Sequence, residues 1–510
     1  MNHEQIIKGS CACFSDNPKR MVDILWSVQN QLGWISTESI ELIAKQTEVC
    51  RADVESVVNF YSFFHQEPQG KFVIYLCNDI IGHQAGMMKV EATIKETLNI
   101  EAGETTADGL FSFHYTSCLG MSDQAPAALI NNVVVSKLSS TKIKRILQTL
   151  KKHGCVNSLF KGTTPSYLDF IHKMVNSNIR KAGPLLIDGH MTESGLQNAL
   201  NLYPNEIIEI LQKSNLRDRD NAGMSTASKW QHTKNTEAIE SYIICNAKED
   251  GPGTFKDRVL LTERANLLFE GMTIAAYTIG STQGILYLRA EYRYLLPHLE
   301  QTLEQRRHKG LLGQAISFNP ETKEIFHFDI QIQLGASSYS FGEESSSISS
   351  STDEKDGLIN SSPFPAQVDY LNWPNVVNNV ETFCNVPLIL ENGVAWFQAL
   401  GTEESKGTKL LSICGDCSKP GVYEFPFGVS VHEVLKAAEV IDAAAVQVGS
   451  MNGELIERVD FNRTLCFEDL TTTGAIIIFS EERDLSEITD YFQKKVKIST
   501  SPHPILEPYL

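Results

Sequence analysis

The sequence predicts a multidomain α/β protein that starts with helices and ends with short strands joined by turns. With 510 residues the chain is long enough for three or four domains, because a single core rarely serves so many residues. Hydrophobic residues make up 42% and charged residues 21% of the chain, as in ordinary globular proteins. A formal net charge of −18 argues against nucleic acid and anionic membrane surfaces as partners.

Residues 1–152 predict a helical segment followed by a small α/β unit. Apolar residues recur at helical spacing from Met21 to Val28 and again from Ile40 to Ala44. Further along, strand patterns lie at residues 71–77, 112–118 and 131–138, and a helix pattern lies at residues 141–151. A connector with weaker helical signals is expected over residues 153–235.

Residues 236–400 predict a second, larger α/β unit. Strand patterns lie at residues 240–247 and 284–292, with a long helix from Leu261 to Thr278 between them and a charged helix ending near Gly310. Within this unit, the serine-rich stretch 337–362 has the composition of a flexible surface loop.

The C-terminal part predicts a small β-rich domain and a tail. Residues 401–490 alternate short strands with Gly and Pro turns, which is typical of a β-grasp fold, and residues 491–510 end in a proline-rich extended segment. The N-terminus shows no export signal, and the longest apolar stretch, from Met272 to Leu288, is broken by glycines as in a buried element. A cytoplasmic location is therefore expected, in which the eleven cysteines stay reduced.

Cys77 and Cys118 each follow a predicted strand. The segments YLCNDIIGHQAG and TSCLGMSDQAP that contain them resemble the thioredoxin-like 24-kDa ferredoxin subunit of complex I. In cluster-bearing members, the resemblance places two further cysteines where this chain has Gly82 and Ser122. A [2Fe–2S] cluster usually takes four thiolates, so the favoured interpretation is two buried cysteines at former ligand positions. A mixed-ligand cluster through the neighbouring His83 and Asp123 is the alternative.

The central motifs carry the most specific resemblance. CNAKEDGPGTFKDRVLL, YLRAEYRYL, SYSFGEES, VVNNVETF and GTKLLSICGDCSKPGVYE are similar to the 51-kDa NADH-binding subunits of complex I. Together with the N-terminal part, they identify the chain as a member of the family of diaphorase large subunits of NAD-reducing hydrogenases, in which the 24-kDa and 51-kDa parts are fused. The resemblance implies FMN and NAD(H) as cofactors. It also implies partners in a hydrogenase- or complex I-like assembly, such as a small diaphorase subunit.

The resemblance also assigns a set of candidate cofactor-binding residues. They are Arg219, Lys229, Asn246, Glu249, Tyr339, Gly342, Glu343, Glu344, Asn378 and Asn379. In the loop LRDRDNAGMSTASKW, however, the family's FMN-binding glycines are replaced by residues that include Asp218 and Asp220. Two carboxylates close to a flavin phosphate repel it and occupy its space. The loop NAKEDGPGT departs in a similar way, with Lys248 and Gly251 at positions that are acidic in the family.

The helical [4Fe–4S] domain of the family is expected to be missing before the tail. The pair Cys414 and Cys417 is interpreted as structural, since zinc would need two more ligands. The sequence thus predicts neither a [2Fe–2S] nor a [4Fe–4S] cluster, no metal and no catalytic residue of its own. A non-catalytic structural or regulatory subunit is the favoured hypothesis. A residual FMN-dependent NADH:acceptor oxidoreductase and a module that senses NAD(H) without redox chemistry are the alternatives.

Overall fold

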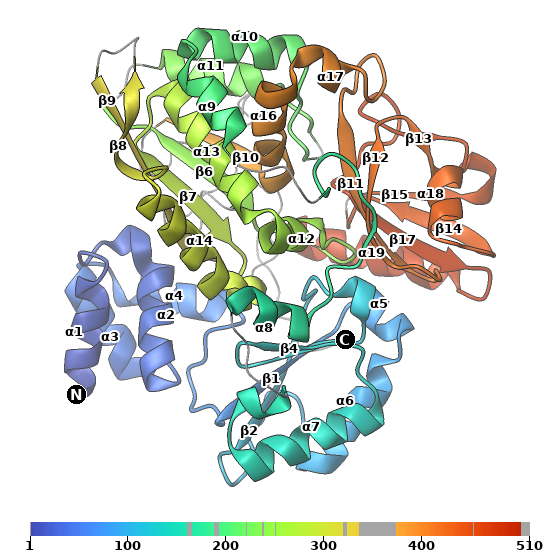
Figure 1. Cartoon of the computed structure of the whole chain (residues 1–510). Coiled ribbons are helices and arrows are strands. Elements are labelled where there is room, and N and C mark those ends of the chain that lie inside the picture. Colours follow the sequence, from blue (N-terminus) through green and yellow to red (C-terminus); the bar gives the residue numbers. More distant parts are fainter. Residues whose placement is uncertain are drawn as a thin grey trace.

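The computed structural model describes residues 2–160, 166–187, 193–220, 222–236, 239–249, 251–319, 324–335, 374–451 and 453–500, with only the backbone for 494–500. Three principal sheets organise these residues, and a helical bundle stands beside them (Figure 1). The serine-rich stretch and the proline-rich tail predicted from the sequence lie outside the described residues, as do Tyr339, Gly342, Glu343 and Glu344.

The chain begins with a bundle of short helices. They are α1 (His3–Ala12), α2 (Met21–Leu32), α3 (Thr37–Thr47) and α4 (Arg51–Phe60). Local signals set their ends: α2 stops at Gly33, which adopts φ 85°, and α3 starts at Ser36, whose side chain accepts a hydrogen bond from the Ser39 N–H. The helices predicted from the apolar spacing at Met21–Val28 and Ile40–Ala44 are confirmed as α2 and α3, and α1 is an addition to them.

The first sheet belongs to the small α/β unit. Its strands are β1 (Phe72–Cys77), β2 (Phe111–Thr116), β3 (Ala128–Ile130) and β4 (Val133–Val135), in the order β2-β1-β3-β4. Only β1 and β2 run parallel among these pairs. The helices of this unit are α5 (Ile80–Gln84), α6 (Met87–Leu98) and α7 (Ser140–His153).

The second sheet holds the larger α/β unit together. It consists of β6 (Tyr242–Ala247), β7 (Gln283–Leu288), β8 (Gly313–Asn319), β9 (Glu324–Leu334) and β10 (Asn375–Asn379), in the order β10-β6-β7-β9-β8. All neighbours except β8 and β9 are parallel. The carboxyl ends of β10, β6 and β7 therefore meet at one edge, where ligands of such sheets usually bind.

The helices of this unit are grouped around α13 (Ala265–Ile279), which lies against β6, β7 and β9. They are α9 (Ser194–Leu200), α10 (Pro204–Ser214), α11 (Thr226–Asn235), α12 (Lys256–Glu263), α13 (Ala265–Ile279), α14 (Leu296–His308), α16 (Val380–Asn392) and α17 (Val394–Gln398). The long helix predicted from Leu261 to Thr278 is two helices instead. Arg264 has φ −129°, outside the helical region, and so ends α12 and starts α13 in a new direction.

The third sheet forms the β-grasp-like C-terminal unit. Its order is β15-β14-β17-β11-β12-β5, built from β5 (Ile179–Lys181), β11 (Thr408–Gly415), β12 (Gly421–Pro426), β14 (Ala443–Val448), β15 (Glu454–Glu457) and β17 (Ala475–Ser480). Strand β5 comes from the connector and pairs with β12, so the connector is tied into this sheet. The helices α18 (Val431–Ala437) and α19 (Leu485–Thr500) complete the unit.

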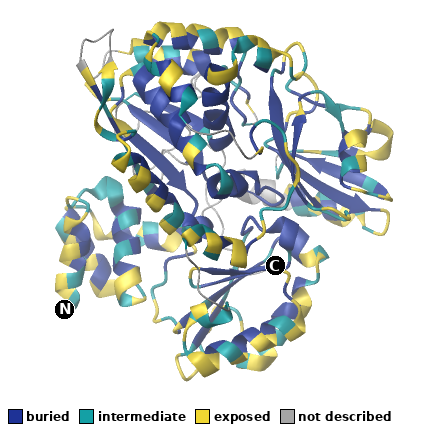
Figure 2. Cartoon of the chain, viewed as in Figure 1, coloured by how far each residue is buried: buried dark blue, intermediate teal, exposed yellow. Residues whose placement is uncertain are grey.

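Buried side chains run continuously from the bundle through the first two sheets and onto one face of the third (Figure 2). Helix α8 (Tyr167–Met174) lies where the small and large α/β units meet. In the described part of the chain, no helix has the length and apolar character needed to cross a membrane.

Candidate functional site

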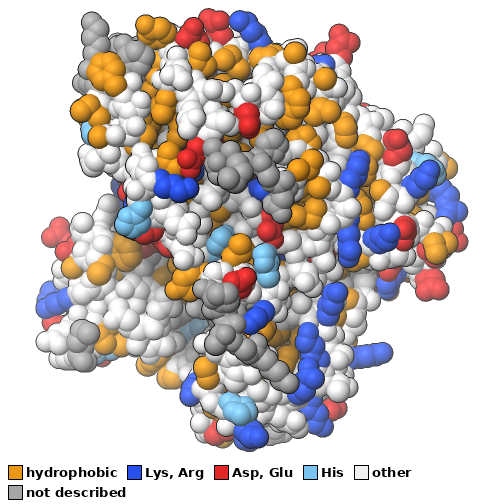
Figure 3. Space-filling model, viewed as in Figure 1, with side chains coloured by type: hydrophobic (Ala, Val, Ile, Leu, Met, Phe, Trp, Pro, Cys, Tyr) orange, Lys and Arg blue, Asp and Glu red, His pale blue; other side chains and the backbone are white. Residues whose placement is uncertain are grey.

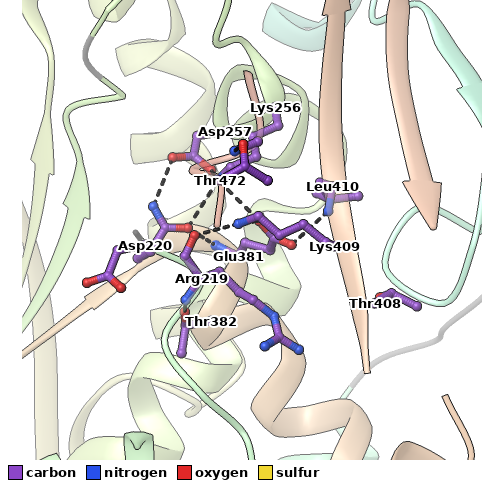
Figure 4. Close-up of polar contacts among 12 residues, drawn as sticks. Arg219, Asp220, Lys256, Asp257, Glu381, Thr382, Thr408, Lys409, Leu410 and Thr472 are labelled. Carbon is purple, nitrogen blue, oxygen red and sulfur yellow. Dashed lines mark hydrogen bonds and ion pairs between the residues drawn. The ribbon is translucent and has the colours of Figure 1, made fainter. Parts of the chain in front are cut away.

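The candidate site lies at the carboxyl edge of the second sheet. Asn379 ends β10 and is paired in register with Asn246 on β6. Helices α12 and α16 start close to these residues, and the loop before α11 and strand β11 close the site from the other side (Figure 4). The fold therefore brings together all the sequence-predicted site residues that the structure describes.

The Asp218 carboxylate is the centre of a buried network in the loop before α11. Its Oδ2 atom accepts hydrogen bonds from Lys229 Nζ at 2.8 Å and from Asn378 Nδ2 at 2.7 Å. Its Oδ1 atom accepts from the Thr382 hydroxyl at 2.5 Å and from the Asn379 N–H at 3.2 Å. Burial alone would raise the pKa of Asp218, but the Lys229 charge and these hydrogen bonds lower it.

Lys229, on α11, is fully buried in this network. Its ammonium also donates to the Val377 carbonyl at 3.2 Å, and its neighbour Trp230 donates to Asn378 Oδ1 at 2.9 Å. The Lys229 ammonium and the side-chain amide of Asn378 are thus directed at protein atoms.

Arg219 is buried with its guanidinium directed away from the sheet edge. The guanidinium donates to the carbonyls of Arg217 and Lys406 and lies 4.8 Å from the centre of the Phe427 ring. Its backbone N–H donates to Thr382 Oγ1 at 2.8 Å. Burial lowers the pKa of Arg219 to about 10. Its role here is to attach the loop to α16 and the C-terminal unit.

A second buried group of charges surrounds Glu381 on α16. Its Oε2 atom lies 3.2 Å from Lys256 Nζ and 3.1 Å from Lys409 Nζ, and Oε1 accepts from the Leu410 N–H at 2.8 Å. Figure 4 shows these side chains converging on Glu381 from α12 and β11. Burial raises the pKa of this carboxyl, but Lys409 and Lys256 outweigh it, so the pKa is lowered. Burial also lowers the pKa of Lys409 to about 8.

Glu249 lies in the loop after β6 and interacts with the start of α12. Its carboxylate accepts from the backbone N–H groups of Asp257 at 2.8 Å and Arg258 at 3.1 Å, and from the Tyr292 hydroxyl at 2.6 Å. Burial, followed by the nearby charge of Asp257, raises the pKa of Glu249 to about 7. This carboxyl therefore titrates near neutral pH.

A small cavity of about 20 Å³ remains in the site. Its walls are Arg219, Asp220, Asn246, Glu249, Thr254, Lys256, Asp257, Asn379 and Thr473. Asp220 accepts a hydrogen bond from the Gly223 N–H at 2.8 Å, and burial and the neighbouring Asp218 raise its pKa. The cavity has room for a water molecule or two.

Lys256, Asp257, Lys409 and Thr473 are site residues that the sequence did not predict. Lys256 and Asp257 stand in the first turn of α12, and Lys409 stands in strand β11. In the sequence, these charged residues look like ordinary solvent-exposed side chains. Lys256 and Lys409 are site residues because they form ion pairs with Glu381, which lies in another segment of the sequence. No local sequence pattern indicates such a pairing.

The predicted ligand positions of the small α/β unit lie close to this site. Cys77 and Cys118 are buried, and Cys118 Sγ accepts a hydrogen bond from the Gly120 N–H at 3.3 Å. Ser122 Oγ accepts from the Gly253 N–H at 3.3 Å, which joins this loop to the loop after β6. In the part of the chain that the structure describes, no three His, Cys, Asp or Glu side chains are arranged to hold a metal ion.

An ion pair also joins the two units. Arg258 on α12 lies 3.1 Å from Asp123 Oδ2, and both side chains are buried. Nearby, the Arg289 guanidinium donates to the Cys118 carbonyl at 2.5 Å, and the Tyr292 hydroxyl group lies where a side chain on Gly120 would stand. The loop at residues 118–124 is therefore fixed against the candidate site.

Comparisons with known proteins place both units in families. Residues 7–151 match the thioredoxin-like [2Fe-2S] ferredoxin family, and residues 211–388 match the Nuo51 FMN-binding domain. The alpha subunit of the NAD-reducing hydrogenase HoxS of Cupriavidus necator is 42% identical over 93% of this chain and 79% of its own length. An NADH-quinone oxidoreductase subunit of Escherichia coli is 32% identical over 57% of this chain and 67% of its own length.

A solved structure agrees with the sequence relatives. A crystal structure of an NAD+-reducing [NiFe]-hydrogenase in the H2-reduced state contains a chain that superposes with a TM-score of 0.83 at 33% identity. The match covers 93% of this chain and 80% of that one. The α/β architecture with a thioredoxin-like unit and a Nuo51-type unit is thereby confirmed.

One expectation requires correction. The sequence was interpreted as having neither a [2Fe–2S] nor a [4Fe–4S] cluster, and the match of residues 7–151 to a [2Fe-2S] ferredoxin family contradicts this. The expectation was wrong because it rested on the four ligand positions alone, of which only Cys77 and Cys118 are cysteines. Membership in the family depends on the sequence pattern of the whole domain.

Proposed function

The chain belongs to the family of diaphorase large subunits of NAD-reducing hydrogenases, and we propose that it serves in such an assembly as a non-catalytic structural or regulatory subunit. Its relatives are electron-input subunits of multi-subunit hydrogenase and complex I-like enzymes. The proposal concerns the flavin site of this chain, which its own side chains fill.

The observation that carries the proposal is the position of Asp218. By family resemblance this residue replaces a glycine of the FMN-binding loop. Its carboxylate accepts hydrogen bonds from Lys229, Asn378 and the Asn379 N–H. These are three of the candidate cofactor-binding residues. An internal anion thus satisfies donors that would otherwise be available to a bound anion.

The space in the site supports the same conclusion. A pocket that encloses a ligand of drug-like size usually has a volume of about 300–1,000 Å³, whereas the cavity between the described residues has about 20 Å³. So small a cavity between the described residues supports a site that is filled by its own side chains.

The negative charge of Asp218 is a further argument for a non-catalytic role. A flavin phosphate beside Asp218 would meet a carboxylate whose pKa is lowered, and which therefore stays ionised. Two like charges about 4 Å apart cost roughly 1–4 kcal/mol at effective dielectric constants of 80 to 20.

One observation favours the second candidate, a residual FMN-dependent NADH:acceptor oxidoreductase. Asn246 and Glu249 still line the cavity, and Glu249 has a pKa of about 7. A group of that pKa can exchange a proton at neutral pH.

The visible spectrum of the purified protein distinguishes the two candidates. We expect no flavin absorption after incubation with FMN followed by desalting, and no change on adding NADH. A yellow protein that bleaches with NADH would contradict the structural role and support the oxidoreductase.

A further inference from the structure

The region between Asp123 and Asp169 differs in charge from the rest of the chain. Residues 124–168 contain seven Lys and Arg and no Asp or Glu, within a chain of net charge −18. Most of these cations stand on or beside α7, the last helix of the thioredoxin-like unit.

Helix α7 separates its apolar and basic residues onto two faces. Ile143, Ile146, Leu147 and Leu150 are buried against the unit. The opposite face exposes Lys144, Arg145, Lys151 and Lys152, and Lys137 is exposed in the segment just before the helix. We call these five cations the basic face. Figure 3 shows Lys and Arg side chains gathered over the lower right of the molecule, where Figure 1 places this unit.

Helix stability explains only part of the basic face. Lys151 and Lys152 lie in the last turn, where positive charge is favourable to the helix dipole. Lys144 and Arg145 lie in the first half of a helix that starts at Ser140 and has no acidic residue in its first turn. Cations there do not offset the dipole and so do not stabilise the helix.

The cations of the first half also repel one another. Burial lowers the pKa of Lys142, and the charges of Arg145 and Lys137 lower it further. Lys142 Nζ donates to the Ser136 carbonyl, which holds it at this position. Among the described residues, Lys144 and Arg145 have no carboxylate as an ion-pair partner. The charges of Lys144 and Arg145 are therefore left without an ion pair in the part of the chain that the structure describes.

We propose that the basic face of α7 is a docking surface for a protein partner that presents an acidic surface. Such a partner reduces the repulsion among these cations and supplies carboxylates to Lys144 and Arg145, for which the described residues provide no ion pair. The inference does not depend on whether the flavin site is closed, because α7 is exposed on another side of the thioredoxin-like unit.

An acidic protein fits this surface better than other polyanions. An extended duplex or an anionic membrane would also meet the acidic remainder of the chain, which repels it. A protein with a local acidic patch needs complementarity only over the basic face. Membership in a family of multi-subunit enzymes makes another subunit the natural source of such a patch.

Fluorescence anisotropy of the full chain with a fluorescein-labelled decaglutamate peptide tests the proposal. The test variant is Lys144→Glu/Arg145→Glu, and the matched control is Lys45→Glu/Lys436→Glu, which makes the same charge change at exposed sites on α3 and α18. We expect the wild type to bind at low salt, the test variant to lose affinity by about tenfold or more, and the control to stay within about twofold. Lys151→Glu/Lys152→Glu should also weaken binding, which guards against misfolding of a single variant.

Several results would overturn the proposal. They are the absence of peptide binding to the wild type, an equal loss in the test variant and the control, and an unchanged affinity in both variants of α7. Patch-dependent binding to a duplex DNA or to phosphatidylserine vesicles that exceeds binding to the peptide would replace the protein partner with that polyanion.

Discussion

The loop around Asp218 and the loop around Glu249 are two regions of one site, and they balance buried charge in different ways. By the family resemblance, Asp218 stands in place of a glycine, yet Lys229 and several hydrogen-bond donors surround it and lower its pKa. By the same resemblance, Glu249 is retained, yet burial and Asp257 raise its pKa to about 7. The new carboxylate is fully matched, whereas the retained one is not.

The difference shows that the charge of a side chain does not by itself say whether a site can hold an anion. In the first region, the Lys229 ammonium is already paired with the Asp218 carboxylate, so little positive potential remains to bind a phosphate. The Glu249 region keeps the cavity and a carboxyl that takes up a proton. The first region supports a structural role, and any remaining chemistry would belong to the second.

Replacing Asp218 with alanine should remove the centre of the first region's hydrogen-bond network and have the largest effect on the free energy of unfolding. The substitution leaves the buried Lys229 ammonium without its partner, which typically costs about 3–5 kcal/mol. Denaturant unfolding should show this loss in the free energy of unfolding. Asp220→Asn is the control, since the amide keeps an oxygen that accepts from the Gly223 N–H, and it should change stability by about 1 kcal/mol or less. A loss of similar size in both variants would contradict the comparison.

The pH dependence of the free energy of unfolding tests the raised pKa of Glu249 in the second region. The pKa of Glu249 rises from an ordinary value of 4.5 to about 7 on folding. Its contribution is therefore fully present below pH 4.5 and is lost as the pH rises through about 7. The loss should be of the order of 3 kcal/mol, since one pKa unit corresponds to about 1.4 kcal/mol. Comparing wild type with Glu249→Gln across this range should show the slope disappear in the variant, and a slope that persists would assign it to another group.

Gly120→Ala should have the smallest effect and probes the support of Glu249. A side chain there would overlap the Tyr292 hydroxyl, which donates to Glu249, and Gly120 has φ 66°. Overpacking of this kind costs about 1–3 kcal/mol. The melting temperature should fall. Gly103→Ala, at a glycine of positive φ with open space around it, is the control for backbone strain alone. An equal fall in both would show that the contact with Tyr292 is unimportant.

Local patterns in the sequence predicted the fold well. Apolar spacing identified α2, α3 and α7 but not α1, and buried apolar runs identified β1, β6 and β7. The break at Arg264 was missed because the apolar pattern continues across it from α12 into α13. The pairing of β5 with β12 was missed because it joins segments about 240 residues apart in a chain with no local signal for it.

The sequence predicted several residues of the candidate site but not how their charges are paired. Family motifs identified Asn246, Asn378 and Asn379, and the parallel strands β6 and β10 bring them together. The sequence interpretation placed Asp218 as a repulsive charge, because the distance to Lys229 in space does not follow from their separation along the chain. Lys409 was missed because its partner, Glu381, lies on a different unit.

Calorimetric titration of FMN into the full-length wild-type protein tests the central claim most directly. If Asp218 has taken the place of the bound anion, no heat of binding should appear up to about 1 mM FMN, which corresponds to a binding free energy weaker than about −4 kcal/mol. Binding with one site per chain and a micromolar Kd would contradict the account.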